Sequence, residues 1–115
     1  MVSLSDIPIP ARQIDDVDLM RLVDLMMGIP SMSEAAFRQS LVEELPLSIR
    51  GMIRRSEAPR MDVRGILRTA RDYPDGLRAV AEAVILILGP TSAADEFRST
   101  VLAVTGTAST GGGGR

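Results

Sequence analysis

The chain has 115 residues and a formal net charge of −2, and 45% of its residues are hydrophobic. These values predict a single globular domain with one core. There is no cysteine or histidine, and all 13 basic residues are arginine. Disulfides, imidazole metal ligands, a Ser-His-Asp triad and a lysine Schiff base are therefore excluded. Only carboxylates remain as an ordinary basis for a catalytic or metal site.

Residues 1–13 contain Pro8 and Pro10 and little periodicity, which predicts an extended N-terminal arm. The first residues have neither the basic nor the long apolar region of a secretory signal. The longest apolar run, residues 84–88, is five residues long, well below the roughly 20 that cross a bilayer. We therefore expect a cytoplasmic protein.

Three helices are predicted in the first half of the chain. An acidic cluster favours the start of the first, because carboxylates stabilise the positive end of the helix dipole. Its inward row is predicted to be Leu19, Leu22, Val23 and Met26. Ser31 and Glu34 have the capping-box spacing for a second helix, whose buried row is predicted to be Phe37, Leu41 and Leu45. A short third helix is predicted over residues 47–54.

The fourth helix is predicted to carry a stripe of arginines. From residue 60 they recur at offsets of four, eight and eleven, at Arg60, Arg64, Arg68 and Arg71. At the pitch of an α-helix these side chains fall within an arc of about 80°. The residue before a proline is disfavoured in a helix, so this helix is predicted to stop at Tyr73. The fifth helix is then predicted to start at Pro74.

The fifth helix, residues 74–88, is the most apolar and is predicted at the centre of the bundle. Its main face is predicted to be Leu77, Val80, Ala81, Val84 and Leu88. Ser92 and Asp95 again have the capping spacing, and the inward row of the last helix is predicted to be Ala94, Phe97, Val101 and Val104. We therefore expect an all-α, compact bundle of about six short helices over residues 14–104. Residues 105–115 are predicted to be a flexible tail, either the start of a linker or a cloning remnant.

Charge is unevenly placed along the chain. Residues 1–49 hold eight acidic residues and three arginines, a net charge of −5, whereas residues 50–71 hold seven arginines and two acidic residues, a net charge of +5. Two surfaces of opposite sign would let the domain bind a copy of itself or a relative. The predicted basic face is Arg54, Arg55, Arg60, Arg64, Arg68 and Arg71. The predicted acidic face is Asp15, Asp16, Asp18, Asp24, Glu43 and Glu44.

Other interpretations of these residues remain open. The arginine stripe is also typical of the solvated side of a helix. A small nucleic-acid-binding domain that uses the basic surface between Arg50 and Arg71 is the alternative function, but the sequence pI of about 5.1 and an aromatic content of 3% argue against it.

Adjacent carboxylates are more typical of solvated surface than of a metal site, so we expect no metal, no cofactor and no enzyme. Five of the methionines, Met20, Met26, Met27, Met52 and Met61, cannot all face one core, which favours an adaptable surface for some of them. We expect most of them to fill the core.

Seven segments together resemble a known family. They are residues 22–32 (LVDLMMGIPSM), Phe37-Arg38, Leu45-Pro46, Ile53-Arg54-Arg55, 60–63 (RMDV), 66–77 (ILRTARDYPDGL) and 91–94 (TSAA). This order resembles the effector-associated domains of bacterial conflict systems, and most of all effector-associated domain 2, which is common in actinobacteria. The most specific part runs from residue 62 to residue 77. Two positions depart from the pattern, since the family leads us to expect cysteine at Ala70 and glycine at Asp75.

The resemblance implies a small helical adaptor with a death-like fold and no catalytic residues. Such a domain would be covalently linked to an effector, such as a protease or a nucleotide-dependent switch. It would recruit or cluster that effector by self-association or by contact with a related domain. The positions that transfer as fold-defining are Asp62, Tyr73, Pro74 and Gly76.

Overall fold

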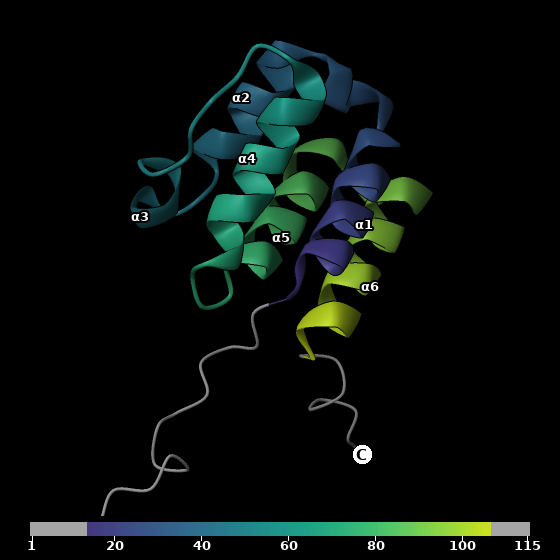
Figure 1. The fold of residues 1–115 in the computed structure, drawn as a ribbon. Coiled ribbons are helices and arrows are strands. Elements are labelled where there is room, and N and C mark those ends of the chain that lie inside the picture. The colour runs from purple at the N-terminus through teal and green to yellow at the C-terminus, as the bar shows by residue number, and fades with distance from the viewer. Residues whose placement is uncertain (1–13, 107–115) are drawn as a thin grey trace, which may run out of the picture.

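The computed structural model describes residues 14–106; the predicted arm, 1–13, and most of the predicted tail, 107–115, lie outside this range. The described residues form an all-α bundle (Figure 1), which confirms the predicted fold class. Its elements are α1 (Asp16–Met27), the 3₁₀-helix η2 (Pro30–Ser33), α2 (Ala35–Glu43), α3 (Leu47–Arg50), α4 (Pro59–Arg71), α5 (Gly76–Leu88) and α6 (Ser92–Thr105). No helix within residues 14–106 is both long and apolar enough to span a bilayer.

Four of the helices pack as a closed ring. In this ring α1 packs against α4 and α6, and α5 packs against the same two helices. The α2 helix packs against α4 and α5, and η2 packs against α1, α2 and α4. The short α3 stands out from the side of the bundle, and the segment after it runs back along α4 (Figure 1).

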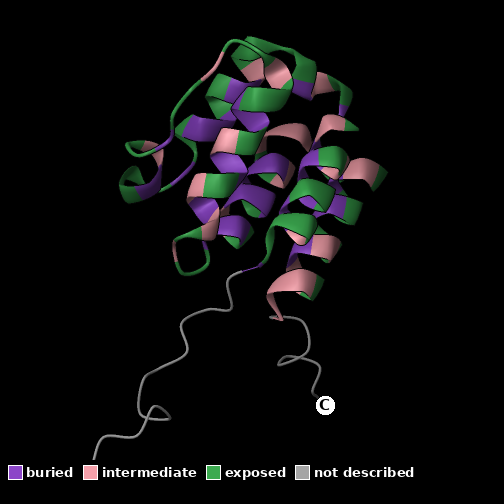
Figure 2. Cartoon of the chain, in the orientation of Figure 1, coloured by how far each residue is buried: buried purple, intermediate pink, exposed green. Residues whose placement is uncertain are grey.

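The core consists of the inward rows of these helices (Figure 2). The row predicted for the first helix is buried throughout, as are Leu77, Val80, Ala81 and Val84 on α5. Ala94, Phe97 and Val101 of α6 and Leu41 of α2 are completely buried. The ends of the predicted rows, Phe37, Leu88 and Val104, are only half-buried. Helical periodicity therefore identified most of the core and overestimated it at the rim.

The predicted capping box at Ser31 and Glu34 is wrong. Pro30 starts the separate 3₁₀-helix, and Glu34 takes an extended conformation at the start of α2 without a side-chain cap. The cap predicted at Ser92 is displaced by one residue, because the hydroxyl of Thr91 accepts the hydrogen bond from the Ala94 amide.

The third helix is shorter than the predicted 47–54, because α3 ends at Arg50 and Gly51 caps it. Beyond the cap the chain turns back along α4, with Ile53 buried in the core. Continuing the helix would carry Arg55 away from the carboxylate on α4 that it contacts. The contact of Arg55 with Asp62 is therefore compatible with the observed turn and not with a helix that continues to residue 54.

The corner between α4 and α5 also differs from the prediction. The fifth helix begins at Gly76, not at Pro74, because Asp75 lies in the left-handed region with φ 59°. Glycine adopts that conformation most readily, which is a physical reason for the glycine that the family pattern led us to expect there. A Cβ atom at Gly76 would overlap the carbonyl oxygen of Ala70. Only glycine therefore allows α5 to start this close to the end of α4.

Candidate protein-interaction surface

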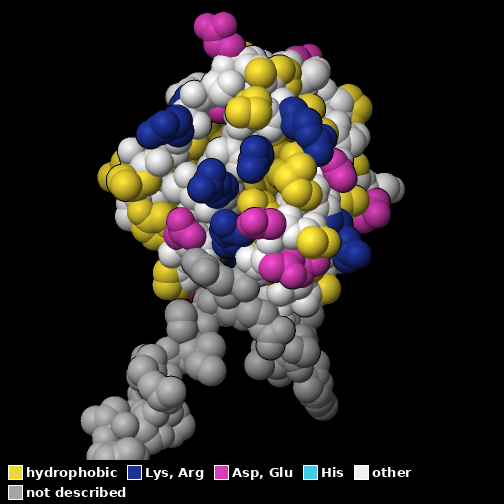
Figure 3. Space-filling model, in the orientation of Figure 1, with side chains coloured by type: hydrophobic (Ala, Val, Ile, Leu, Met, Phe, Trp, Pro, Cys, Tyr) yellow, Lys and Arg dark blue, Asp and Glu magenta, His cyan; other side chains and the backbone are white. Residues whose placement is uncertain are grey.

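The acidic and basic residues predicted for separate faces partly lie side by side. Asp16 at the start of α1 pairs with Arg71 at the end of α4, with 2.9 Å between oxygen and nitrogen. Asp24 pairs with Arg60 at the other end, at 2.6 Å. The two helices therefore run antiparallel, and side chains of both signs mix on their common face (Figure 3). Arg60 and Arg71 thus have their charges matched within the chain.

The α4 arginines also act on Asp16. A hydrogen bond from Arg71 and its positive charge hold the pKa of the Asp16 carboxyl below its usual range, and the charges of Arg68 and Arg64 add to the effect. Arg64 and Arg68 therefore lie near enough to the start of α1 to act on Asp16 through their charge.

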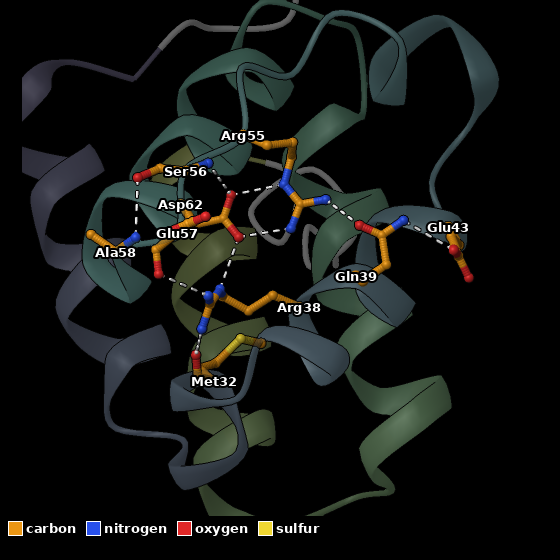
Figure 4. Close-up of polar contacts among 9 residues, drawn as sticks. All are labelled: Met32, Arg38, Gln39, Glu43, Arg55, Ser56, Glu57, Ala58 and Asp62. Carbon is orange, nitrogen blue, oxygen red and sulfur yellow. Dashed lines mark hydrogen bonds and ion pairs between the residues drawn. The ribbon is translucent and has the colours of Figure 1, made fainter.

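Beneath this surface lies a buried ion pair that joins α2 to α4 (Figure 4). The Arg38 side chain is 2% exposed and donates from Nε to Oδ2 of Asp62, itself completely buried, at 2.8 Å. Arg38 Nη1 also donates to the Met32 carbonyl at 2.8 Å. Because both charges are removed from water, each depends on the other for compensation.

A second arginine reaches the same carboxylate from the opposite side. Arg55 donates from Nε to Oδ1 of Asp62 at 2.8 Å and from Nη2 to Oδ2 at 2.7 Å, and the Ser56 amide donates to Oδ1 at 3.1 Å. Arg55 Nη1 also donates to Gln39 Oε1 at 2.6 Å. Burial alone would raise the pKa of Asp62, but the hydrogen bonds from Arg55, Arg38 and Ser56 outweigh it and hold the pKa at about 2. Asp62 is therefore ionised throughout the neutral range.

This network holds the segment after α3 against α4. The Arg54 carbonyl lies so near Gly65 that a Cβ atom added there would be 2.8 Å from its oxygen. Arg55, predicted as part of the basic face, is thus engaged with Asp62, while its neighbour Arg54 remains exposed. The network therefore sets the position from which Arg54 projects.

Between this segment and α4 lies a groove with a volume of about 520 Å³. We define the Met–Arg groove by five of its lining residues: Met52, Arg54, Met61, Arg64 and Arg68. Met52 is 66% exposed and Met61 is 56% exposed. Arg54, Arg64 and Arg68 are exposed, and the acidic residue Asp72 also lines the groove. The groove thus combines exposed methionines with three exposed arginines and one carboxylate.

The remaining predicted acidic residues lie away from the groove. Asp15 caps α1 by accepting the Asp18 amide at 2.8 Å, and Asp18 is half-buried. Glu43 and Glu44 are exposed at the end of α2, where Glu43 accepts a hydrogen bond from Gln39. No group of three or more carboxylates within the described residues is arranged to hold a metal ion.

Sequence reasoning missed the role of Arg38. This residue occupies an inward position on α2, one turn before Leu41 and Val42, and Asp62 precedes Val63 in the inward row of α4. Each of these charged residues interrupts an apolar row, and a buried charge requires a partner of opposite sign. The sequence therefore contained a signal for the pair. Of the five methionines, Met26 is buried and Met20, Met52 and Met61 are exposed. The expectation that they do not all face one core is confirmed, and the expectation that most of them fill the core is wrong.

Comparison with known families gives one match. Residues 23–102 match the model of effector-associated domain 2. Comparisons with curated proteins and with solved structures gave no match. The matched range begins within α1, ends within α6 and includes both the buried network and the Met–Arg groove. The chain belongs to the effector-associated domain 2 family.

Proposed function

We propose that this domain is a non-catalytic adaptor of a bacterial conflict system. It recruits or clusters a covalently linked effector through contact with the same or a related helical domain. A cytoplasmic location is part of this proposal. Family membership supports the association with an effector, and the Met–Arg groove supports contact with another protein.

The groove is the observation that carries the proposal. Methionine and arginine are enriched in protein interfaces, where methionine adapts its shape to a partner and arginine forms directed hydrogen bonds. The two exposed methionines and the exposed arginines beside them make no evident contribution to the stability of the folded domain. A partner that covers the methionines and supplies carboxylates would satisfy both features.

Nucleic acid fits this surface less well than an acidic protein does. Asp16 and Asp24 hold exposed negative charge along the same stripe, beside Arg71 and Arg60. These ion pairs neutralise Arg60 and Arg71, so the stripe has less positive charge for a phosphate backbone. Retention of duplex or single-stranded DNA or RNA on a filter at low salt would favour nucleic acid instead.

The test compares two charge reversals of equal size. The groove variant is R64E/R68E, and the control is R21E/R78E, in which both arginines are exposed and outside every ion pair within residues 14–106. Each tagged chain is co-expressed with the related effector-associated domains of its own genome. We expect the groove variant to lose co-purification and the control to retain it, with unchanged helical content and melting temperature in both. Normal co-purification of the groove variant would show that the arginines are ordinary surface.

A further inference from the structure

We propose that the Met–Arg groove of one copy receives a protruding acidic corner of a second copy. The acidic corner consists of Glu43, Glu44 and Leu47, where the end of α2 leads into α3. This inference rests on the proposed function and adds to it the identity of the occupant and the residues on its side of the contact.

The corner has the shape and exposure of an inserted element. It belongs to the part of the chain around α3 that stands out from the bundle (Figure 1). Leu47 is 71% exposed, whereas Ile49, two residues later, is 3% exposed and anchors the helix in the core. The core therefore fixes the corner through Ile49 and leaves Leu47 without cover in the isolated domain.

The charges of the corner complement those of the groove. Glu44 forms none of the ion pairs or side-chain hydrogen bonds found within residues 14–106, and the Glu43 carboxylate accepts a hydrogen bond from the neutral amide of Gln39. The nearby Arg50 is engaged with a backbone group, since Nη1 donates to the Glu43 carbonyl at 2.8 Å. Two carboxylates beside an exposed leucine thus match arginines beside exposed methionines.

The groove of the same chain does not receive this corner, because none of its three residues lines that groove. Corner and groove have no residue in common. Each copy that donates a corner therefore still has its own groove open, and each copy that accepts one still has its own corner. A contact of this kind joins copies head to tail and extends unless the rotation between them closes a ring. That geometry clusters linked effectors.

The first test is a charge exchange across the contact, using the complete 115-residue chain. E43R/E44R and R64E/R68E should each weaken self-association at least about tenfold in sedimentation velocity, because each places like charges together. The combined variant E43R/E44R/R64E/R68E exchanges the signs and should recover the affinity of the unmodified chain to within about threefold. A combined variant that stays as weak as the single-surface variants would overturn the inference.

The second test removes the apolar side chain of the corner. Leu47→Ser should weaken self-association about tenfold, since the contact would bury that side chain. Leu86→Ser is the matched control, because Leu86 is 68% exposed on α5 and lies outside the groove lining. Equal effects of the two substitutions would contradict insertion of Leu47.

These tests separate the inference from the proposed function. A chain that remains monomeric at all concentrations overturns the inference. If that monomeric chain still co-purifies with a related domain, and the R64E/R68E variant does not, the adaptor function stands and the groove receives another protein. The chain could also self-associate, recover its affinity in the charge-exchanged variant and yet co-purify with no related domain. That result would support the inference and count against recruitment as the function.

Discussion

The carboxylate of Asp62 accepts a hydrogen bond from Arg38 at 2.8 Å in the interior of the domain, 24 residues apart in the sequence. Arg55 completes the arrangement by binding both oxygens of the same carboxylate. The ionic centre thereby joins α2, α4 and the segment after α3. Because that segment forms one wall of the Met–Arg groove, a buried interaction determines the form of an exposed surface.

Replacing Asp62 by asparagine should destabilise the domain by about 3–5 kcal/mol. The amide keeps the shape of the side chain but leaves the buried guanidinium of Arg38 without an opposite charge. Chemical denaturation monitored by circular dichroism measures the loss. Asp24→Asn, which breaks an exposed ion pair, is the control and should change stability by less than about 1 kcal/mol. A similar decrease in the free energy of unfolding in both variants would show that the buried charge of Asp62 contributes little to stability.

The stability of the domain should fall in acid through Asp62. Its pKa is about 2 in the folded protein against an ordinary value of 3.8, so the unfolded chain binds the proton first as the pH falls. The contribution is therefore present above about pH 4 and is lost progressively towards pH 2, by roughly 2 kcal/mol in total. Unfolding free energies at pH 5 and pH 2.5 measure it. D62N should lack this part of the pH dependence, and an identical dependence in D62N would assign the effect to other carboxylates.

A substitution at the corner between α4 and α5 should stabilise the domain. Asp75 occupies the left-handed region at φ 59°, where a side chain costs more than glycine does. Asp75→Gly should therefore raise the free energy of unfolding by about 0.5–1 kcal/mol.

Gly76→Ala, one residue later, is the contrasting substitution in that corner. It should destabilise the domain, because the added methyl group would overlap the Ala70 carbonyl. Thermal melts of both variants test the pair. A stable Gly76→Ala protein would mean that the start of α5 can shift away from Ala70.

The helices could be predicted from the sequence because their apolar rows repeat at the helical period. Leu19, Leu22, Val23 and Met26 are an example, and all four are buried. Helix ends were less predictable, because an apolar row does not mark the residue at which a helix starts or stops. The observed end of α3 is compatible with the contact of Arg55 with Asp62, and the start of α5 depends on the backbone conformation of Asp75.

The interaction surface could be predicted only in part. Periodicity placed Arg64 and Arg68 on one side of α4, but it gave no means of seeing that Arg60 and Arg71 are paired with residues of α1. Those pairs depend on which helices pack together. The groove also depends on the chain between Met52 and Ser56 lying against α4, which the Asp62 network secures. Sequence spacing does not contain that information.

We propose above all that another protein binds the Met–Arg groove through Arg64 and Arg68. The most direct measurement is the affinity of the domain for its partner domain in R64E/R68E relative to R21E/R78E. Each variant changes the net charge from −2 to −6, because two positive charges become two negative ones, so general electrostatic effects are matched. We expect the affinity to be at least about tenfold lower in R64E/R68E and near the unmodified value in R21E/R78E. Equal affinities in the two variants would contradict it.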